Sequence, residues 1–345
     1  MTNQHEITKR MPLLNREGNL TEPGWARGLL WDYHRPDIRA SGMRIKEWDY
    51  YFVSNGHIGL ALTIADNGYM GLDSVSYLDF DEKWEITKSP MRLLPMGKTA
   101  LPETSAAGSS EIARGGYALA FYHDDDGTRK LTFHMDKFRG KDAIEGMISL
   151  SDEPAESMVI ATPFEKSGHF YYNQKINCMR AAGWIELGGA RVELEPETWF
   201  AVLDWGRGVW TYHNTWYWGS ASGELDGVPF GWNIGYGFGD TSAASENVLF
   251  YGGKIHKLSQ VRFEIPMQDG KEDYLAPWRF SSDDGRFEMA FTPILNRAAY
   301  TSVGVIKSDQ NQVFGRFTGT AALDGGTVLQ VNDFFGFAEK VDNKL

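Results

Sequence analysis

The chain has 345 residues, 42% of them hydrophobic and 23% charged, a composition typical of a globular protein long enough for two domains. Its formal net charge of −12 argues against nucleic acid or an anionic membrane as the main partner, because both call for a basic face, although a local basic patch is compatible with it. No run approaches the roughly 18 apolar residues of a membrane span and no secretory signal is evident, so we expect a cytoplasmic protein without integral membrane association.

The aromatic content of 14% and the 38 glycines favour strands and turns over helices. Residues 48–72 show strand-like alternation with two hairpin turns, at Asn55-Gly56 and Asn67-Gly68. A third hairpin is predicted over residues 117–138, with its turn at Asp124 to Gly127. Further short strands are predicted at residues 157–164, 168–176, 183–194, 198–205, 246–258, 261–266, 286–295, 312–320 and 327–338. Strands at this spacing predict an all-β protein made of antiparallel barrels or sandwiches.

A weak internal repeat indicates two similar units. Residues 183–192 align with residues 319–328, and an aromatic strand follows each segment. The identical pairs are Gly183 with Gly319, Leu187 with Leu323, Gly189 with Gly325, and Val192 with Val328. This pattern favours an internal duplication. We place the joint at Pro196, with an N-terminal unit over residues 1–196 and a C-terminal unit over residues 197–345.

Tryptophan is concentrated in one region, since five of the twelve lie between Trp199 and Trp218. Alternate side chains of a strand share a face, so Trp216 and Trp218 are expected to project together. An aromatic lining with a few polar groups is typical of a small-molecule pocket. The alternative is that these rings fill a barrel or an interdomain seam. Buried charged groups such as Asp204 and Arg207 are costly as mere filler, which favours the pocket.

Long segments resemble a bacterial family catalogued as domain of unknown function 2804. The resemblance lies in residues 203–223, "LDWGRGVWTYHNTWYWGSASG", and in residues 44–69, 230–258 and 276–294. It covers most of the chain, and it carries no function, because that family is uncharacterised.

A more distant resemblance does imply a fold and a reaction. Asp204, Trp205-Gly206 and Trp216-Tyr217-Trp218 are similar to the "D-x-x-W-G … W-x-W" pattern of lipocalin-like proteins that include carotenoid hydratase. The resemblance implies two packed lipocalin-like β domains and acid-catalysed addition of water to an alkene. The chain departs from the pattern because Trp205 follows Asp204 directly, which puts the reaction in doubt more than the fold.

We therefore expect acid–base transformation, of hydratase/lyase or isomerase type, of an apolar, lipid- or isoprenoid-like molecule. Such chemistry needs an acid held protonated by burial among apolar rings. Asp204 and Asp240 are the candidate acids, and His213 is the candidate proton relay. The residues expected to contact the ligand are Trp210, Trp216, Trp218, Trp232, Asn233, Tyr236, Arg207, Glu246, Trp48, Asp49, Tyr50 and His57.

Two other functions stay open at this point. A carbohydrate-active enzyme would stack sugars on tryptophan and use paired carboxylates, and a non-catalytic carrier would need only the cavity. No metal or other cofactor is expected, because the histidines lack paired metal-ligand spacing and Cys178 is the only cysteine. The sequence leaves the oligomeric state open.

Overall fold

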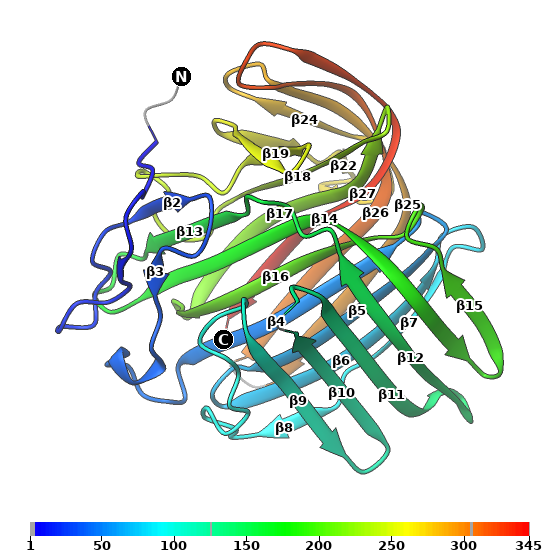
Figure 1. Ribbon diagram of the computed structural model, residues 1–345, viewed down its shortest axis with the longest axis horizontal. Helices are drawn as coiled ribbons and strands as arrows, with labels where there is room; N and C mark the ends of the chain where they lie inside the picture. Colours follow the sequence, from blue (N-terminus) through cyan, green and yellow to red (C-terminus); the bar gives the residue numbers. More distant parts are fainter. Residues whose placement is uncertain (1–3, 125, 304–305, 345) are drawn as a thin grey trace.

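A computed structural model describes residues 4–124, 126–303 and 306–344. Within these ranges the only helical element is a 3-10 turn, η1 (Arg35–Asp37), and no helix there is long and apolar enough to cross a membrane. Two large antiparallel sheets curl and pack against each other (Figure 1). The prediction of an all-β protein is confirmed.

The first sheet contains fourteen strands, with the central order β7-β6-β5-β4-β16-β14-β12-β11-β10-β9. Its strands are β2 (Gly24–Ala26), β4 (Ile45–Ser54), β5 (Ile58–Asp66), β6 (Met70–Asp79), β7 (Trp84–Lys88), β8 (Met91–Leu93), β9 (Gly108–Arg114), β10 (Tyr117–His123), β11 (Arg129–Arg139), β12 (Asp142–Ser151), β13 (Met158–Pro163), β14 (Phe170–Leu187), β15 (Ala190–Leu194) and β16 (Phe200–Val209). Two short strands beside it, β1 (Met11–Pro12) and β3 (Trp31–Asp32), form a separate parallel pair.

The three predicted hairpins of this sheet are present. Asn55-Gly56 joins β4 to β5, and Asn67-Gly68 joins β5 to β6. Gly56 and Gly68 have φ values of 82° and 78°, a left-handed conformation that glycine adopts without strain. The third hairpin joins β10 to β11, and Asp125 of its turn lies outside the described residues.

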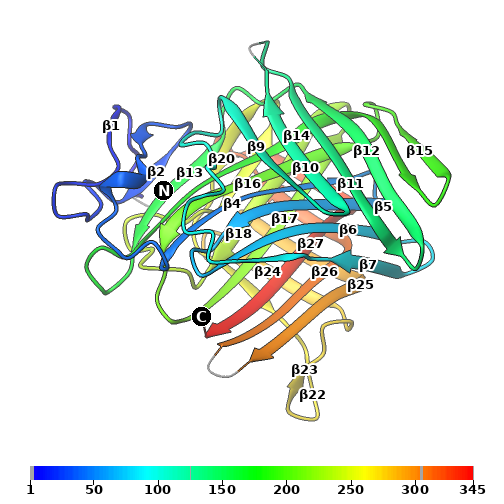
Figure 2. The same cartoon turned by 90° about the horizontal axis from the view of Figure 1, so that it is seen from below.

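The second sheet contains nine strands, in the order β20-β19-β18-β17-β27-β26-β25-β24-β21. Its strands are β17 (His213–Leu225), β18 (Val228–Tyr236), β19 (Val248–Tyr251), β20 (Lys254–Lys257), β21 (Val261–Glu264), β24 (Trp278–Ser282), β25 (Phe287–Val303), β26 (Ile306–Ala322) and β27 (Val328–Lys344). A small hairpin, β22 (Met267–Gln268) with β23 (Lys271–Glu272), projects from it (Figure 2).

The two sheets share one topology. In each, the last long strand pairs with the first, β16 with β4 and β27 with β17. One pair of the repeated glycines also has a common role: a Cβ on Gly183 would lie 2.1 Å from the Met147 carbonyl oxygen, and one on Gly319 would lie 2.0 Å from that of Glu288. Both positions thus need the close backbone approach that only glycine permits, which supports the internal duplication.

The strands change sheets between Val209 and His213, and not at Pro196. Strand β16, which we assigned to the C-terminal unit, pairs with β14 and β4 of the first sheet. An aromatic strand follows each repeated segment, and these two strands, β16 and β27, each pair with the first long strand of their own sheet. The division of the chain into two domains stays a prediction.

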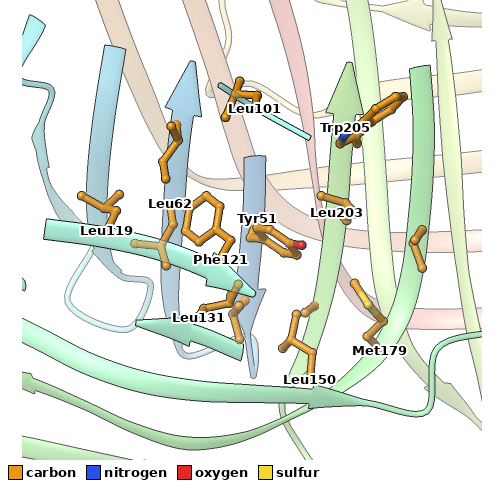
Figure 3. Close-up of a cluster of buried hydrophobic side chains, with 14 of the residues drawn as sticks. Tyr51, Leu62, Leu101, Leu119, Phe121, Leu131, Leu150, Met179, Leu203 and Trp205 are labelled. Atoms are coloured by element: carbon orange, nitrogen blue, oxygen red, sulfur yellow. The ribbon is translucent and has the colours of Figure 1, made fainter. Parts of the chain in front are cut away.

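Strand β16 is buried at all ten positions, so both of its faces are covered. Leu203 and Trp205 point into the core of the first sheet, near Tyr51 (Figure 3). Val202, on the other face, packs on side chains of the second sheet. We call this layer between the sheets the seam; its buried apolar residues include Tyr50, Phe52, Val202, Trp218, Phe314 and Phe337.

Candidate functional site

The seam contains a row of polar side chains from the first sheet. Lys175 on β14 lies directly opposite Asp204 on β16, and Asp204 lies opposite Tyr50 on β4. The Lys175 ammonium is 2.8 Å from Asp204 Oδ2, and Asn173 Nδ2 donates to Asp204 Oδ1 at 2.6 Å. All these side chains are buried, and a buried charge persists only when it is paired in this way. Asp204 is thus held by both an ammonium and an amide group.

A second row, from the second sheet, faces the first. Trp218 on β17 lies opposite Glu339 on β27. The Lys175 ammonium lies 3.8 Å from the Trp218 ring centroid, a cation–π contact across the seam. The Trp218 ring also meets Tyr50 edge to face, at 5.9 Å between centroids. Neither sheet alone contains this arrangement.

Glu339 is a carboxyl group held in an apolar setting. It is 4% exposed. One of its oxygens accepts a hydrogen bond from Trp216 Nε1 at 2.8 Å, and the other accepts one from Gln310 Nε2 at 3.1 Å. Burial raises the pKa of Glu339, against the lowering effects of these hydrogen bonds and of the Arg297 and Lys175 charges. The group is therefore biased toward its protonated form.

Glu246, just before β19, is the third carboxyl group. Its Oε2 accepts from Asn233 Nδ2 at 3.2 Å, while Asn233 Oδ1 accepts from Trp218 Nε1 at 2.7 Å. Burial raises the pKa of Glu246, and the nearby charge of Asp204 adds to the rise. A Cβ on Gly235 would lie 2.5 Å from Glu246 Oε1, so the glycine makes room for this carboxyl group. We call Asp204, Glu246, Glu339 and Lys175 the acid cluster.

Tyr171 adds a neutral hydroxyl to the acid cluster. It shares a face of β14 with Lys175, because the two are separated by an even number of residues. Burial raises the pKa of Tyr171 well above its ordinary value, and the charges of Glu246, Asp204 and Glu339 raise it further. The phenol therefore stays protonated as a hydrogen-bond donor.

Aromatic rings enclose one side of the acid cluster. Trp210 meets Trp48 at 5.3 Å, Trp216 at 5.8 Å and Phe238 at 5.0 Å between centroids. Trp48 needs Gly206, where a Cβ would lie 1.9 Å from its ring. Among the described residues Trp210 Nε1, although buried, has no hydrogen-bond partner. We call Trp48, Tyr171, Trp210, Trp216 and Phe238 the aromatic wall.

A cavity of about 290 Å³ opens into the seam at its opposite end. Its lining residues include Phe52, Phe200, Val202, Ser220, Ser222, Arg316, Phe335 and Phe337. Val202 lies two positions before Asp204, and Phe337 lies two positions before Glu339, so each pair shares a strand face. The two strand faces that line the cavity therefore also carry Asp204 and Glu339, and neither carboxyl group lines the cavity itself.

The structure brings together eight of the residues proposed from the sequence. They lie in the seam, around the acid cluster: Asp204, Glu246, Trp48, Tyr50, Trp210, Trp216, Trp218 and Asn233.

Seven others lie elsewhere. Arg207 and Asp49 form an ion pair, at 3.0 Å, on the opposite face of β16 and β4, inside the first sheet. Trp232 and Tyr236 pack in the core of the second sheet, on the opposite face of β18 from Asn233. Three are exposed at the surface, namely His57, His213 and Asp240.

Asp240 is not the buried acid we expected. It is exposed and accepts the Ser242 backbone N–H at 2.9 Å, and this hydrogen bond lowers the pKa of Asp240. Asp204 belongs to β16, and not to the aromatic strand β17 that pairs with the strand before Asp240. The two carboxyl groups therefore do not share one cavity mouth.

Four important residues were missed by the sequence analysis: Tyr171, Asn173, Lys175 and Glu339. A signal for three of them exists in "YYNQKIN", residues 171–177, where Asn173, Lys175 and Asn177 place polar side chains at every second position of a buried strand. Such a polar stripe inside a buried strand indicates a polar site on one face. Glu339 likewise continues the face of Phe335 and Phe337.

Comparison with family models decides the identity of the chain. The model described as domain of unknown function (DUF2804) matches residues 4–345. The chain belongs to the DUF2804 family. This confirms the resemblance seen in the sequence. No curated protein matches the chain.

The DUF2804 protein is similar to solved structures at low sequence identity. A crystal structure from Nitrosomonas europaea, provisionally named AttH, has a TM-score of 0.53 at 13% identity and covers 86% of this chain and 92% of its own. The likeness shows a shared fold, which confirms the lipocalin-like architecture.

Two further structures superpose less closely, each with a TM-score of 0.49. One is CghA with Sch210972, at 10% identity over 99% of this chain and 97% of its own. The other is kievitone hydratase from Nectria haematococca, at 8% identity over 97% of this chain and 98% of its own.

Proposed function

We propose that this DUF2804 protein catalyses acid–base chemistry, of hydratase/lyase or isomerase type, on an apolar, lipid- or isoprenoid-like molecule bound in the seam. The observation that carries the proposal is the composition of the acid cluster. Three carboxyl groups lie around a single ammonium, and only one of them, Asp204, is directly ion-paired with it. Arg297 and Lys257 act on the cluster without contacting it. Such a cluster favours at least one neutral carboxylic acid.

We assign the proton donor to Glu339. Its pKa is raised by burial, it follows Phe337 of the cavity on the same strand face, and Trp216 of the aromatic wall holds it in place. A carboxylic acid with a raised pKa is suited to protonate a weakly basic carbon near neutral pH.

We assign the base to Asp204, which is paired with the Lys175 ammonium. In a hydration, Glu339 gives its proton to one alkene carbon, and a water adds to the other while losing a proton to Asp204. The reverse order is a dehydration, and loss of a different carbon-bound proton is an isomerisation. The faces of the aromatic wall would stabilise positive charge on the substrate.

The cavity suits the remainder of such a substrate. Phe52, Phe200 and Val202 supply apolar contact, and the lining also carries polar groups, among them Glu224, Arg316 and Asp333. Apolar contacts combined with polar groups that fix the orientation are how small-molecule sites bind a ligand.

Deuterium exchange tests this proposal without knowledge of the final product. The protein is incubated in D₂O with panels of isoprenoid alkenes and unsaturated lipids, and mass spectrometry follows deuterium entering carbon positions. We expect exchange with the wild-type protein and a loss of about 10²–10⁴-fold in Glu339→Gln.

Two results would contradict the proposal. A lipid that co-purifies and leaves the protein unchanged, with no exchange, would support the carrier function. Release of reducing sugar from an oligosaccharide, with no response to alkenes, would support a carbohydrate-active enzyme.

A further inference from the structure

Five apolar side chains are exposed together at the edge of the first sheet. They come from β8, from the loop after it and from the segment before β4: Met43, Met91, Leu93, Leu94 and Met96. Leu93 is 87% exposed and Met91 is 67% exposed. Figure 1 shows β8 at the border of the molecule. Large exposed clusters of apolar side chains commonly mark an interaction surface. We call these residues the apolar patch.

The patch is held together by one hairpin tip. Leu94 N–H donates to the Tyr69 carbonyl at 3.0 Å, and Met96 N–H donates to the Gly68 carbonyl at 3.1 Å. A Cβ on Gly68 would lie 2.5 Å from the Met43 backbone, so Met43 packs against the same tip. The five side chains therefore belong to one continuous surface.

Buried ion pairing fixes the direction of these side chains. Arg92, between Met91 and Leu93, turns inward and binds both oxygens of buried Asp73, at 2.7 and 2.9 Å. Alternation along the strand then points Met91 and Leu93 outward. Farther along, the Gly97 N–H donates to Asp66 at 2.8 Å. These hydrogen bonds fix the conformation of the loop and keep its apolar side chains exposed.

The backbone adds an independent observation. Leu94 and Met96 have φ values of 49° and 46°, in the left-handed region where asparagine and glycine are favoured. Apolar side chains at two such exposed positions carry a conformational cost. The exposure and the backbone strain together indicate that these apolar side chains serve an interaction.

The charges around the patch are basic, in contrast to the chain as a whole. Residues 88–98, "KSPMRLLPMGK", contain no acidic side chain, and Lys88 and Lys98 are exposed at the two ends. Leucine and methionine flanked by lysine suit a membrane surface, where apolar groups enter the headgroup boundary and ammonium groups meet lipid phosphates.

The patch also adjoins the aromatic end of the seam. Lys46, two positions before Trp48 on the same face of β4, donates to the Asn67 carbonyl of the hairpin tip at 2.8 Å. Arg44, next to Met43, donates to the Trp210 carbonyl at 2.9 Å. A surface seated on the patch would thus lie beside Trp48 and Trp210 of the aromatic wall.

We propose that the apolar patch docks the protein reversibly on a lipid membrane containing anionic headgroups, with the aromatic end of the seam turned toward the lipid. Docking in this orientation would let an apolar molecule pass from the bilayer to the seam without crossing water. The docking itself does not depend on the proposed reaction.

Vesicle flotation tests the docking. Vesicles of phosphatidylcholine with phosphatidylglycerol should carry the wild-type protein upward, and vesicles of phosphatidylcholine alone should carry less. The double variant Leu93→Gln/Leu94→Asn should bind about tenfold or more weakly, because two partly inserted leucines are lost. Asparagine accepts the left-handed conformation at position 94, so the fold is retained.

Matched variants separate the apolar from the electrostatic contribution. Met267, on β22 outside the patch, is 63% exposed, close to the 67% of Met91. The variant Met267→Gln should therefore bind vesicles as the wild type does. Lys88→Gln/Lys98→Gln should reduce binding to mixed vesicles to the level seen with phosphatidylcholine alone.

Three outcomes would overturn the proposal. The first is no flotation of the wild-type protein with either vesicle, and the second is equal flotation of the Leu93→Gln/Leu94→Asn variant. The third is a dimer in sedimentation that dissociates in this variant, since a second copy would then cover the patch. None of these readouts involves turnover, so failure of the proposed reaction would leave a positive docking result intact.

Discussion

Two buried charged clusters lie on opposite faces of β4 and β16, and their charges are balanced differently. Inside the first sheet, Arg207 and Arg35 face Glu47 and Asp49, two cations against two anions. In the seam, the acid cluster has three carboxyl groups and one directly contacting cation.

This difference separates structure from chemistry. The main role of a balanced buried cluster is to fix the packing, because its groups bind one another and the backbone. Among the described residues, Arg207 Nε and Arg35 Nη2 still have no hydrogen-bond partner. A cluster with more carboxyl groups than contacting cations favours holding protons, and groups that hold protons near neutral pH are the ones that acid–base catalysis uses. The two clusters therefore predict opposite responses to mutation.

The largest effect is expected on turnover in the seam. Glu339→Gln removes the donated proton while keeping the shape of the side chain and one of its two accepted hydrogen bonds, so turnover should fall by about 10²–10⁴-fold with the fold intact. Asp240→Asn is the matched control, because Asp240 is exposed, and its turnover should equal that of the wild type. Equal losses in both variants would contradict the assignment of the acid.

The next effect concerns stability inside the first sheet. Arg207 is fully buried and donates to Asp49 Oδ1 and to the Trp48 and Pro102 carbonyls, at 3.0, 2.8 and 2.8 Å. Arg207→Met leaves these acceptors unpaired and should lower the free energy of unfolding by about 3–5 kcal/mol, as measured by urea titration. If Arg207→Met lowered the free energy of unfolding no more than Glu339→Gln does, the two clusters would not differ in their structural role.

A smaller effect is expected at Trp218, which links the two sheets. Trp218→Phe keeps an aromatic ring but loses the hydrogen bond to Asn233 and weakens the contact with Lys175. Unfolding free energy should fall by about 1–2 kcal/mol, and ligand affinity should fall with it. If affinity stays unchanged while stability falls, Trp218 is a packing residue outside the ligand site.

The sequence was sufficient for the architecture and for part of the site. Strand spacing and Asn-Gly turns predict an all-β fold, because alternation and turn chemistry are local properties. The dense aromatic region pointed to Asp204, Trp216 and Trp218, which lie together in the seam, and their role in a site stays a prediction.

The other site residues could not be predicted, because their place depends on which of the two buried faces of a strand they occupy. A strand such as β16 is covered on both sides, so its pattern does not show that Asp204 faces the seam while Arg207 faces the interior. The same limit explains the wrong placement of Trp232 beside correctly placed Asn233. Lys175 and Glu339 reach the site through pairings between distant segments, which only the folded chain brings together.

The central claim is that the seam holds carboxyl protons at a higher pH than the unfolded chain does. Burial raises the pKa of both Glu246 and Glu339, so between the unfolded value of about 4.3 and the raised native values the native state binds more protons. The contribution of these two groups to the free energy of unfolding is therefore fully present at pH values below the unfolded pKa. It is lost as the pH rises through the native pKa.

The most direct test compares urea unfolding of the wild type with that of Glu246→Gln/Glu339→Gln across this pH range. The glutamine variant lacks both titrations, so the difference in unfolding free energy isolates them from all other groups. We predict that the wild type loses stability relative to the variant as pH rises, by about 1.4 kcal/mol for each unit by which a pKa is raised. A difference that stays constant with pH, or that grows in favour of the wild type as pH rises, would contradict the account.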